Sequence, residues 1–446
     1  MAQGITRRRF IVMGGACFAS AILPGCGGKG GNGKNGGKPP GDDDDDHVGP
    51  DDDMVDDDTS DDDTTADDDT GGELGADAVL LGLYTASSAA SPQDAVRLVC
   101  QKLDWSWLAS GDSVFIKVAC NSGNRHPAVT SPAAVRAVVN ELFARGAGRV
   151  VVGDQSGVAS VRLAPGDQRY GATRSLMNAN GLFEAITDSG AEPHLFDEQD
   201  YDAGYFAATL PFFDAHWYAP PRVPEIIRNV DHIIYLPRLG SHMIAGYTHG
   251  HKCAVGWLRD DSRHELHFKA DSLHEKFVEV NYCQEIRDRH RLTITLAEKL
   301  LLDAGPDAGT ITPADPWIII ASSHLANHDA LSVAALAFVD DHTPPSGAGL
   351  ISPYGKRSDL YNRSLLLMIP AATGIPWTSD APGNYTALKI HNYQQGIASD
   401  RALTRAYEIL GGVPASIEVQ LTGESPAPEF KNFLESFSGG IFKIQT

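Results

Sequence analysis

Residues 113–154, which read SVFIKVACNSGNRHPAVTSPAAVRAVVNELFARGAGRVVVGD, decide the fold of this chain. The apolar run at 113–119 predicts a strand that is buried on both faces, as strands of parallel sheets are. Residues 131–146 then predict a helix that starts at a capping serine, ends at a glycine and carries an apolar stripe of Val135, Val138, Val139, Leu142 and Phe143. A second apolar run at 149–153 completes a strand–helix–strand unit. This unit predicts an α/β fold with parallel strands.

Strand and helix patterns alternate on both sides of this unit. We expect a mostly parallel sheet flanked by helices, with a loop-rich aromatic insertion at residues 201–224. The other expected strands cover residues 78–84, 193–196, 232–236, 292–295 and 317–322, and the other expected helices cover 92–108, 182–189, 272–287, 328–338 and 400–410.

The N-terminal segment indicates where the protein works. Thr6-Arg7-Arg8-Arg9-Phe10 precedes a short apolar stretch and resembles a twin-arginine export signal. Leu23-Pro24-Gly25-Cys26 resembles a lipobox, whose cysteine is acylated after cleavage of the signal. The apolar stretch is too short to span a bilayer, which takes roughly 20 residues. We therefore expect residues 1–26 to be a signal peptide, and the protein to be an exported lipoprotein held at the membrane through Cys26, on the periplasmic side or the cell surface.

Residues 27–72 have almost no side chains to bury, and 17 of the 28 residues from Asp42 to Asp69 are aspartate. This composition predicts a disordered Gly/Asp-rich tether, extended by repulsion between its charges. The tether accounts for much of the net charge of −22, since residues 73–446 carry 30 basic and 41 acidic side chains. A mildly acidic globular part without a basic run argues against nucleic acid as a partner.

The cysteines exclude two kinds of cofactor. The globular part holds Cys100, Cys120, Cys253 and Cys283, and their pairing is left open by their irregular spacing. No Cys-x-x-Cys motif occurs, so the sequence supports neither a ferredoxin-type iron–sulfur cluster nor a c-type haem.

Several local patterns coincide with one family. Phe115-Ile116-Lys117, the Thr130-Ser131-Pro132 helix start, the segment 146–154 and the segment from Tyr235 to Gly256, with His242 and Lys252, resemble the domain of unknown function 362 family. The resemblance covers residues 78–340 and leaves 341–446 as a C-terminal extension. It implies an α/β domain, sometimes fused to iron–sulfur modules, without a generally established activity. The chain departs from the family pattern at two acidic positions. Thr295 or Leu296 stands where the family has the first acidic residue. The second acidic residue is replaced near Ser332 or displaced to Asp329.

The strand ends carry the first candidate site residues. Alternation along the strand places Lys117 on a sheet face that helices should cover, where a buried ammonium needs a partner. Asp154, at the carboxyl end of the neighbouring strand, is the expected partner, and ligands of open α/β sheets bind beyond these ends. We therefore take Lys117 and Asp154 as candidate catalytic residues, although a purely structural pair is an equal alternative. Asn121 and Ser156 are candidate substrate-binding residues that line the pocket expected at the strand ends. The loop 153–157, which contains Ser156, could present backbone amides to an anion.

Histidines are concentrated in one segment: seven of the 16 lie within residues 232–274. His242, His249 and His251 could hold a divalent transition metal, because imidazole suits zinc, iron, nickel and copper. An anionic or small-molecule pocket built with Arg238, Lys252 and Arg263 is an equal alternative, and a set of structural histidines is a third.

A second possible metal pair follows the expected strand at 317–322. His324 and His328 would emerge at the carboxyl end of that strand and, in a fully parallel sheet, would face Asp154. The leading hypothesis from the sequence is an exported α/β lipoprotein that acts as a metal-dependent enzyme on a small anionic substrate at the strand ends. A non-catalytic lipoprotein that binds a metal or an anion is the alternative, and a protein that docks a partner through the aromatic insertion is the third.

Overall fold

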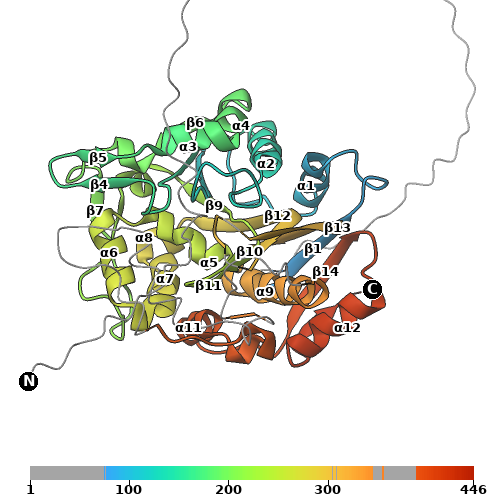
Figure 1. The fold of residues 1–446 in the computed structure, drawn as a ribbon. Helices are drawn as coiled ribbons and strands as arrows, with labels where there is room; N and C mark the ends of the chain where they lie inside the picture. Colours follow the sequence, from blue (N-terminus) through green and yellow to red (C-terminus); the bar gives the residue numbers. More distant parts are fainter. Residues whose placement is uncertain are drawn as a thin grey trace, which may run out of the picture. The chain divides into compact units, whose positions relative to one another are not determined.

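Within the part of the chain that the structure describes, a mixed sheet of eleven strands forms the central layer of the fold (Figure 1). The computed structural model describes residues 75, 77–303, 305–307, 309–344, 354–355 and 388–445. Along the main path the strand order is β15-β14-β1-β13-β12-β9-β2-β3-β6, with the β10–β11 hairpin attached to β12. The strands are β1 (Val79–Tyr84), β2 (Ser113–Val118), β3 (Arg149–Asp154), β6 (Glu192–Leu195), β9 (His232–Leu236), β10 (Gly240–His242), β11 (Gly246–Thr248), β12 (His290–Leu302), β13 (Thr310–Ser322), β14 (Ile417–Gly423) and β15 (Phe442–Ile444).

One strand of the main path runs against all the others. β13 is antiparallel to both of its neighbours, β1 and β12, whereas every other pair along the path is parallel. The mostly parallel α/β sheet expected from the sequence is therefore confirmed. The carboxyl ends of β2, β3 and β9 lie together at one edge of the sheet, and the carboxyl end of β13 lies at the opposite edge.

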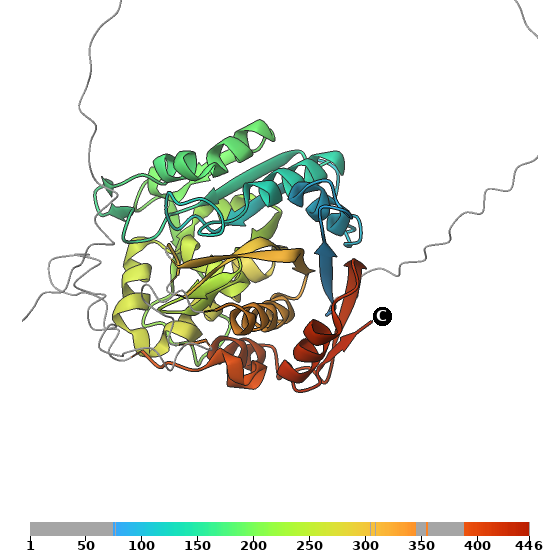
Figure 2. The same cartoon turned by 45° about the vertical axis from the view of Figure 1, so that its right-hand side comes forward.

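Each face of the sheet has its own apolar core. Alternation along β2 sends Val114, Ile116 and Val118 to one face, where α1 (Pro92–Cys100), α2 (Pro132–Ala144) and α4 (Leu182–Asp188) cover them. Phe115 points to the other face, whose larger core is shared with α7 (Leu273–Asn281), α9 (Leu325–His342), α11 (Arg401–Ile409) and α12 (Pro428–Phe437). Figure 2 shows α9, α11 and α12 on one side of the sheet and the helices α1 and α2 on the other.

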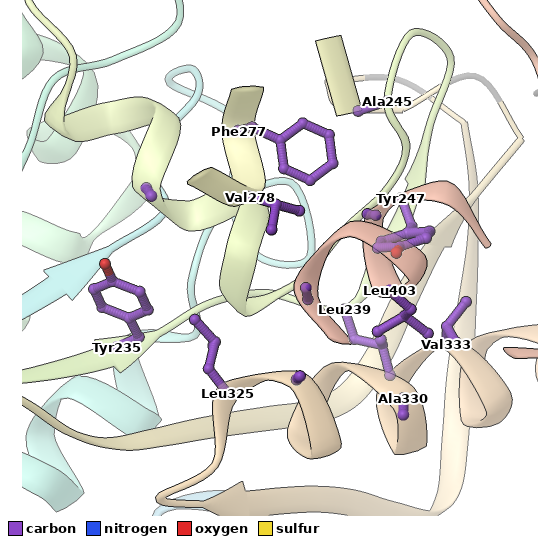
Figure 3. Packing of buried hydrophobic residues seen from close by; sticks show 14 of the residues in the cluster. Tyr235, Leu239, Ala245, Tyr247, Phe277, Val278, Leu325, Ala330, Val333 and Leu403 are labelled. Atoms are coloured by element: carbon purple, nitrogen blue, oxygen red, sulfur yellow. The ribbon is translucent and has the colours of Figure 1, made fainter. Parts of the chain in front are cut away.

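The larger core is closed by side chains from distant parts of the chain. Figure 3 shows Tyr247 of β11 and Leu403 of α11 gathered near Val333 of α9, with Phe277 of α7 close by. All four side chains are buried. Burial of this apolar surface fixes the β10–β11 hairpin and the residues that follow it.

Smaller elements complete the fold. α3 (Thr173–Asn180) follows the β4–β5 hairpin (Arg162–Ala164 and Gln168–Tyr170), and α8 (Gln284–Arg287) precedes β12. α5 (Gly250–Cys253), the 3₁₀ helix η3 (Ala254–Trp257) and α6 (Asp260–Phe268) follow β11. The aromatic insertion contains the two-stranded sheet β7 (Tyr205–Ala207) and β8 (Arg222–Pro224), and it buries Trp217 while Phe213 is exposed.

Several element boundaries differ from those expected. The helix predicted over 92–108 ends at Cys100, whose carbonyl oxygen accepts a hydrogen bond from the buried indole of Trp105 at 2.8 Å. The helix predicted over 272–287 is divided into α7 and α8, because the Asn281 amide caps carbonyl groups of α7. β12 and β13 are each 13 residues long, more than expected, and the pair β14 and β15 was not predicted.

The expected signal peptide, the lipobox cysteine Cys26 and the tether lie outside the described residues. Within the described ranges, no helix combines the length and the apolar character needed to cross a membrane.

Candidate functional site: a cationic cluster at the strand ends

The candidate site lies at the edge of the sheet where β2, β3 and β9 end. Asn121 follows β2, Asp154 ends β3, and Arg238 follows β9. The chain then forms the β10–β11 hairpin, α5, η3 and α6, which together cover this edge (Figure 1). Most of the residues predicted as a site therefore come from one region of the fold.

Lys117 and Asp154 form a buried ion pair. The Lys117 Nζ atom lies 2.6 Å from Asp154 Oδ1 and also donates to the Val118 carbonyl oxygen at 2.8 Å. The second carboxylate oxygen of Asp154 accepts from the Cys120 amide at 2.6 Å. The predicted partnership is confirmed, and all the polar contacts of the pair are made within the protein. This geometry favours a structural role over a catalytic one.

The segment after α5 seals this ion pair. A Cβ atom at Gly256 would lie 1.9 Å from Asp154 Oδ1 and 2.3 Å from Lys117 Nζ, so only glycine fits at this position. The ring of Trp257 lies 5.6 Å from Lys117 Nζ, and the Cys253 thiol donates to the Lys117 carbonyl oxygen at 3.6 Å. Burial raises the pKa of Cys253 to about 12, as expected for a structural thiol.

Asn121 and Ser156 also have partners inside the protein. The Asn121 side-chain amide donates to Asp307 at 2.7 Å, and the Asn121 backbone carbonyl oxygen accepts from the Gly157 amide. The Ser156 amide donates to Thr173 Oγ1 at 3.0 Å, and the Ser156 hydroxyl lies 3.5 Å from the Cys120 sulfur. The expectation that this loop offers free amides to an anion is therefore wrong for Ser156 and Gly157.

Arg238, Lys252 and Arg263 bring positive charge together under this cover. Arg263 is held in place, because it donates to the carbonyl oxygens of Ser156, Gln155 and Gly256 at 2.7, 2.9 and 3.1 Å. Arg238 is 1% exposed; one terminal nitrogen donates to the Pro127 carbonyl oxygen at 2.9 Å, and the other has no partner among the described residues.

Lys252 is half-buried, and its ammonium makes neither a hydrogen bond nor an ion pair with any residue that the structure describes. Burial, followed by the charges of Arg238 and Arg263, lowers the pKa of Lys252 to about 8. The ordinary pKa of a lysine is 10.5. The charges of the two arginines lower this pKa by more than the charge of Asp154 raises it.

His242 adds a neutral donor to this cluster. Its Nδ1 atom accepts from the amides of Ile244 and Ala245, both at 3.2 Å, so the proton of the neutral ring is on Nε2. Burial, followed by the charge of Lys252, holds the pKa of His242 well below its ordinary value. We define the cationic cluster as Arg238, His242, Lys252 and Arg263.

The structure does not gather His242, His249 and His251 into a metal site. Among the described residues, no group of three or more His, Cys, Asp or Glu side chains is placed to hold a metal ion. His251 is engaged by Asp329 at 2.8 Å and by the Tyr282 hydroxyl at 3.0 Å. The ring of His249 stacks on Tyr247 at 4.3 Å, in the core, and burial lowers its pKa to about 3.

Asp329 fixes the position of α5. This fully buried carboxylate of α9 accepts from the amides of Gly250 and His251, and from the rings of His251 and His328, each at 2.8 Å. These contacts hold the pKa of Asp329 well below its ordinary value, against the effect of burial, with the His251 charge as the largest lowering cause. Asp329, the anchor of α5, was not predicted as a site residue. An acidic residue within an apolar stretch of a helix is nevertheless a signal of a buried, paired charge.

The alternative pair His324 and His328 does not face Asp154. Because β13 is antiparallel, its carboxyl end lies at the other edge of the sheet, and this expectation is wrong. His324 caps α9 by accepting from the Asn327 amide at 3.1 Å. His328 is fully buried between Asp329 and the Thr295 hydroxyl.

Two further histidines of this region and the four cysteines have structural places. His232 pairs with Asp112 at 2.9 Å, and His274 packs in the core against Phe277. Cys100, Cys120, Cys253 and Cys283 are free and buried. A surface cavity of about 240 Å³, lined by residues that include His216, Tyr218 and Arg401, contains none of the predicted site residues.

Comparison with solved structures gives distant similarity. A crystal structure of a protein from Thermotoga maritima aligns with 12% identity and a TM-score of 0.31. The alignment covers 50% of this chain and 52%, about half, of that protein. The lactate racemase apoprotein from Thermoanaerobacterium thermosaccharolyticum aligns with 10% identity and a TM-score of 0.36 over 82% of this chain and 94% of that one. No curated protein matches the chain in sequence.

The family comparison agrees with the sequence motifs. Residues 114–334 match the family model described as domain of unknown function (DUF362). This range holds the whole cationic cluster, the Lys117–Asp154 pair and the anchor Asp329. Just under half of the chain is therefore similar to this family.

Proposed function

We propose that this protein binds a small anion through Arg238, His242 and Lys252 at the carboxyl edge of its sheet. The observation that carries the proposal is that the half-buried ammonium of Lys252 and one terminal nitrogen of the buried Arg238 lack hydrogen-bond partners among the described residues. Removing a charge from water is costly unless an opposite charge compensates it. A bound carboxylate, sulfate or phosphate would supply that charge.

The neighbouring acids already have partners. Asp154 is paired with Lys117, and Asp307, whose charge opposes the lowering of the Arg238 pKa by burial, accepts from the Asn121 side-chain amide. His242 directs a neutral N–H group, which can donate to an anion without adding a further charge. Ligands of open α/β sheets bind at this edge, so the position also favours a binding site.

Sulfate is the first probe, because it remains a dianion across the pH range of interest. In titration calorimetry on the full chain, Lys252→Met is expected to weaken sulfate binding about 10- to 100-fold, the range for loss of a hydrogen bond to a charged group. Lys269→Met is the matched control: Lys269 is also half-buried, but its ammonium lies against the rings of Tyr218 and Phe268. Equal sulfate affinity in the two variants would contradict the proposal.

The affinity for sulfate should also depend on pH. Because the pKa of Lys252 is about 8, the ammonium loses its proton as the pH rises through that value, and binding should weaken between pH 7 and pH 9. Lys252→Arg keeps its charge over this range and should remove the pH dependence. Without an anion, the effect of pH on stability has the opposite sign. Between pH 8 and 10.5 Lys252 binds fewer protons in the folded state than in the unfolded state, so it makes the free energy of unfolding rise with pH in that window.

Export and lipid anchoring belong to the same proposal. The twin-arginine motif and the lipobox ending at Cys26 support an exported protein whose tether separates the binding domain from the membrane. Cys26→Ala is expected to abolish incorporation of labelled palmitate and to release the protein from the membrane fraction. Retention of the label after this substitution would argue against Cys26 as the lipidated residue.

A further inference from the structure

A surface cavity lies where the aromatic insertion, the start of α7 and the C-terminal extension meet. Its volume is about 240 Å³, and its lining includes His216, Asp271, Ser272, Glu275, Lys389 and Arg401. Pockets for drug-sized ligands measure roughly 300–1,000 Å³, so this cavity suits a smaller molecule. None of these residues belongs to the proposed anion site, and Lys389 and Arg401 lie beyond the range 114–334 that matches the family model.

The cavity presents both signs of charge. Its lining holds two carboxylates, those of Asp271 and Glu275, and two cations, those of Lys389 and Arg401. Arg401, the first residue of α11, pairs with Oε1 of Glu275 in α7, and the two helices pack against each other (Figure 1). The positive and negative groups therefore come from different elements and meet at one opening.

One oxygen of Glu275 is buried without a partner. The Glu275 side chain is 14% exposed, and while Oε1 accepts from Arg401, Oε2 has no hydrogen-bond partner among the described residues. Leaving a buried carboxylate oxygen without a donor is costly, and such a group in a native structure calls for a partner. An ammonium group of a ligand in the cavity can donate to this oxygen.

His216 provides a second acceptor. Its Nδ1 atom lies 2.6 Å from Oε1 of the fully buried Glu279, and its backbone amide donates to the other carboxylate oxygen at 2.9 Å. In the neutral ring the proton is therefore on Nδ1, and Nε2 is left as an acceptor. Glu279 also accepts from Arg405 at 3.0 Å, so the imidazole rests on a buried carboxylate that is itself held in place.

We propose that this cavity binds a small α-amino acid in its zwitterionic form. The ammonium group of the ligand donates to Glu275 Oε2 and His216 Nε2, next to the charge of Asp271. The carboxylate of the ligand accepts from Arg401 and Lys389, since guanidinium and ammonium groups both bind carboxylates. A simple anion would meet two acids in this cavity, and a simple cation would meet two bases. A ligand with both charges complements both pairs.

Three probes separate the two charges of the ligand. L-Alanine carries both charges, propionate lacks the ammonium group, and ethylamine lacks the carboxylate. NMR titrations of the full chain with each compound measure the dissociation constants. L-Alanine is expected to bind at least about tenfold more tightly than either analogue, because each analogue loses the hydrogen bonds of one charged group. An affinity for L-alanine no higher than that for propionate or ethylamine would overturn the inference.

Glu275→Gln tests the position of the ammonium group and should weaken L-alanine binding about tenfold or more. Glu285→Gln is the matched control: Glu285 is 13% exposed and pairs with Arg228, much as Glu275 pairs with Arg401, but it lies outside the cavity lining. The control should bind L-alanine as the unaltered chain does. Equal affinities in the two variants would contradict the proposed position.

Lys389→Gln tests the carboxylate end without disturbing the core, because Lys389 is exposed. It should weaken L-alanine binding about two- to fivefold, the range for an exposed charge pair, and should leave ethylamine binding unchanged. Lys443→Gln, at another exposed lysine, is its control and should bind L-alanine normally. Unchanged L-alanine affinity in both Glu275→Gln and Lys389→Gln would place the ligand elsewhere and overturn the inference.

Lys252→Met separates this cavity from the proposed anion site, whose cations can also attract a carboxylate. L-Alanine should bind this variant as it binds the unaltered chain. If Lys252→Met weakens L-alanine binding as much as Glu275→Gln does, the amino acid is held at the cationic cluster. That result would overturn the inference and leave the anion site standing.

Discussion

Lys117→Met is expected to lower the free energy of unfolding by about 3–5 kcal/mol, the usual cost of removing one member of a buried ion pair. The substitution leaves the carboxylate of Asp154 buried, with only the Cys120 amide as a partner. Methionine fills much of the lysine volume, so the loss comes mainly from the uncompensated charge and less from a cavity. Urea unfolding followed by circular dichroism measures the change.

Two further variants identify the cause of that loss. Arg149→Met on the neighbouring strand removes an exposed ion pair with Glu192 and should change stability by about 1 kcal/mol or less. Adding Asp154→Asn to Lys117→Met removes the stranded charge, keeps an acceptor for the Cys120 amide, and should recover part of the loss. A loss in Lys117→Met no larger than that in Arg149→Met would show that the buried pair contributes little.

Asp329→Ala should lower the free energy of unfolding by a similar amount, about 3–5 kcal/mol. The substitution removes the carboxylate that accepts hydrogen bonds from several buried donors, and these donors are then left without an acceptor. Four donors are affected: the amides of Gly250 and His251 and the rings of His251 and His328. The same variant should weaken sulfate binding, because α5 loses its anchor and Lys252 loses its fixed position. Urea unfolding and calorimetry on one preparation measure both effects.

Asp188→Ala is the control for this substitution, since Asp188 is 57% exposed and pairs with Arg136 at the surface. Its change in stability should stay within about 1 kcal/mol. Acid provides a second check. The pKa of Asp329 is held below its ordinary value, so its contribution is complete above about pH 4 and is lost as the pH falls through the folded-state value. The difference between Asp329→Ala and the unaltered chain should therefore shrink in acid.

The strands that surround the site could be predicted because their sequences are nearly continuous apolar runs. Residues 113–119 and 149–153 leave few alternatives to buried parallel strands, and the pairing of Lys117 with Asp154 follows from their neighbouring ends. The direction of β13 could not be read from its own residues, because an apolar strand has the same pattern in either direction. The turn that follows β12, with Gly305 and Pro306, was the available signal for a hairpin.

The histidines show where spacing along the sequence stops being informative. His249 and His251 are two residues apart, yet one stacks on Tyr247 and the other binds Asp329, which lies 78 residues away in the chain. Which partner a ring meets depends on the packing of α5 against α9, and no local pattern encodes that packing. The alternative of an anion pocket built with Arg238, Lys252 and Arg263 stays a prediction.

The pairing of β1 with β14 has a consequence for how the domain is made. Leu80 lies opposite Gln420, so two neighbouring strands are separated by most of the chain. During synthesis, β1 emerges from the ribosome long before its neighbour, and one of its edges stays open until residues 417–423 follow. Contacts of such high sequence separation slow folding and leave a strand edge available to other chains. The nascent domain is therefore expected to depend on chaperones until its last strands are translated.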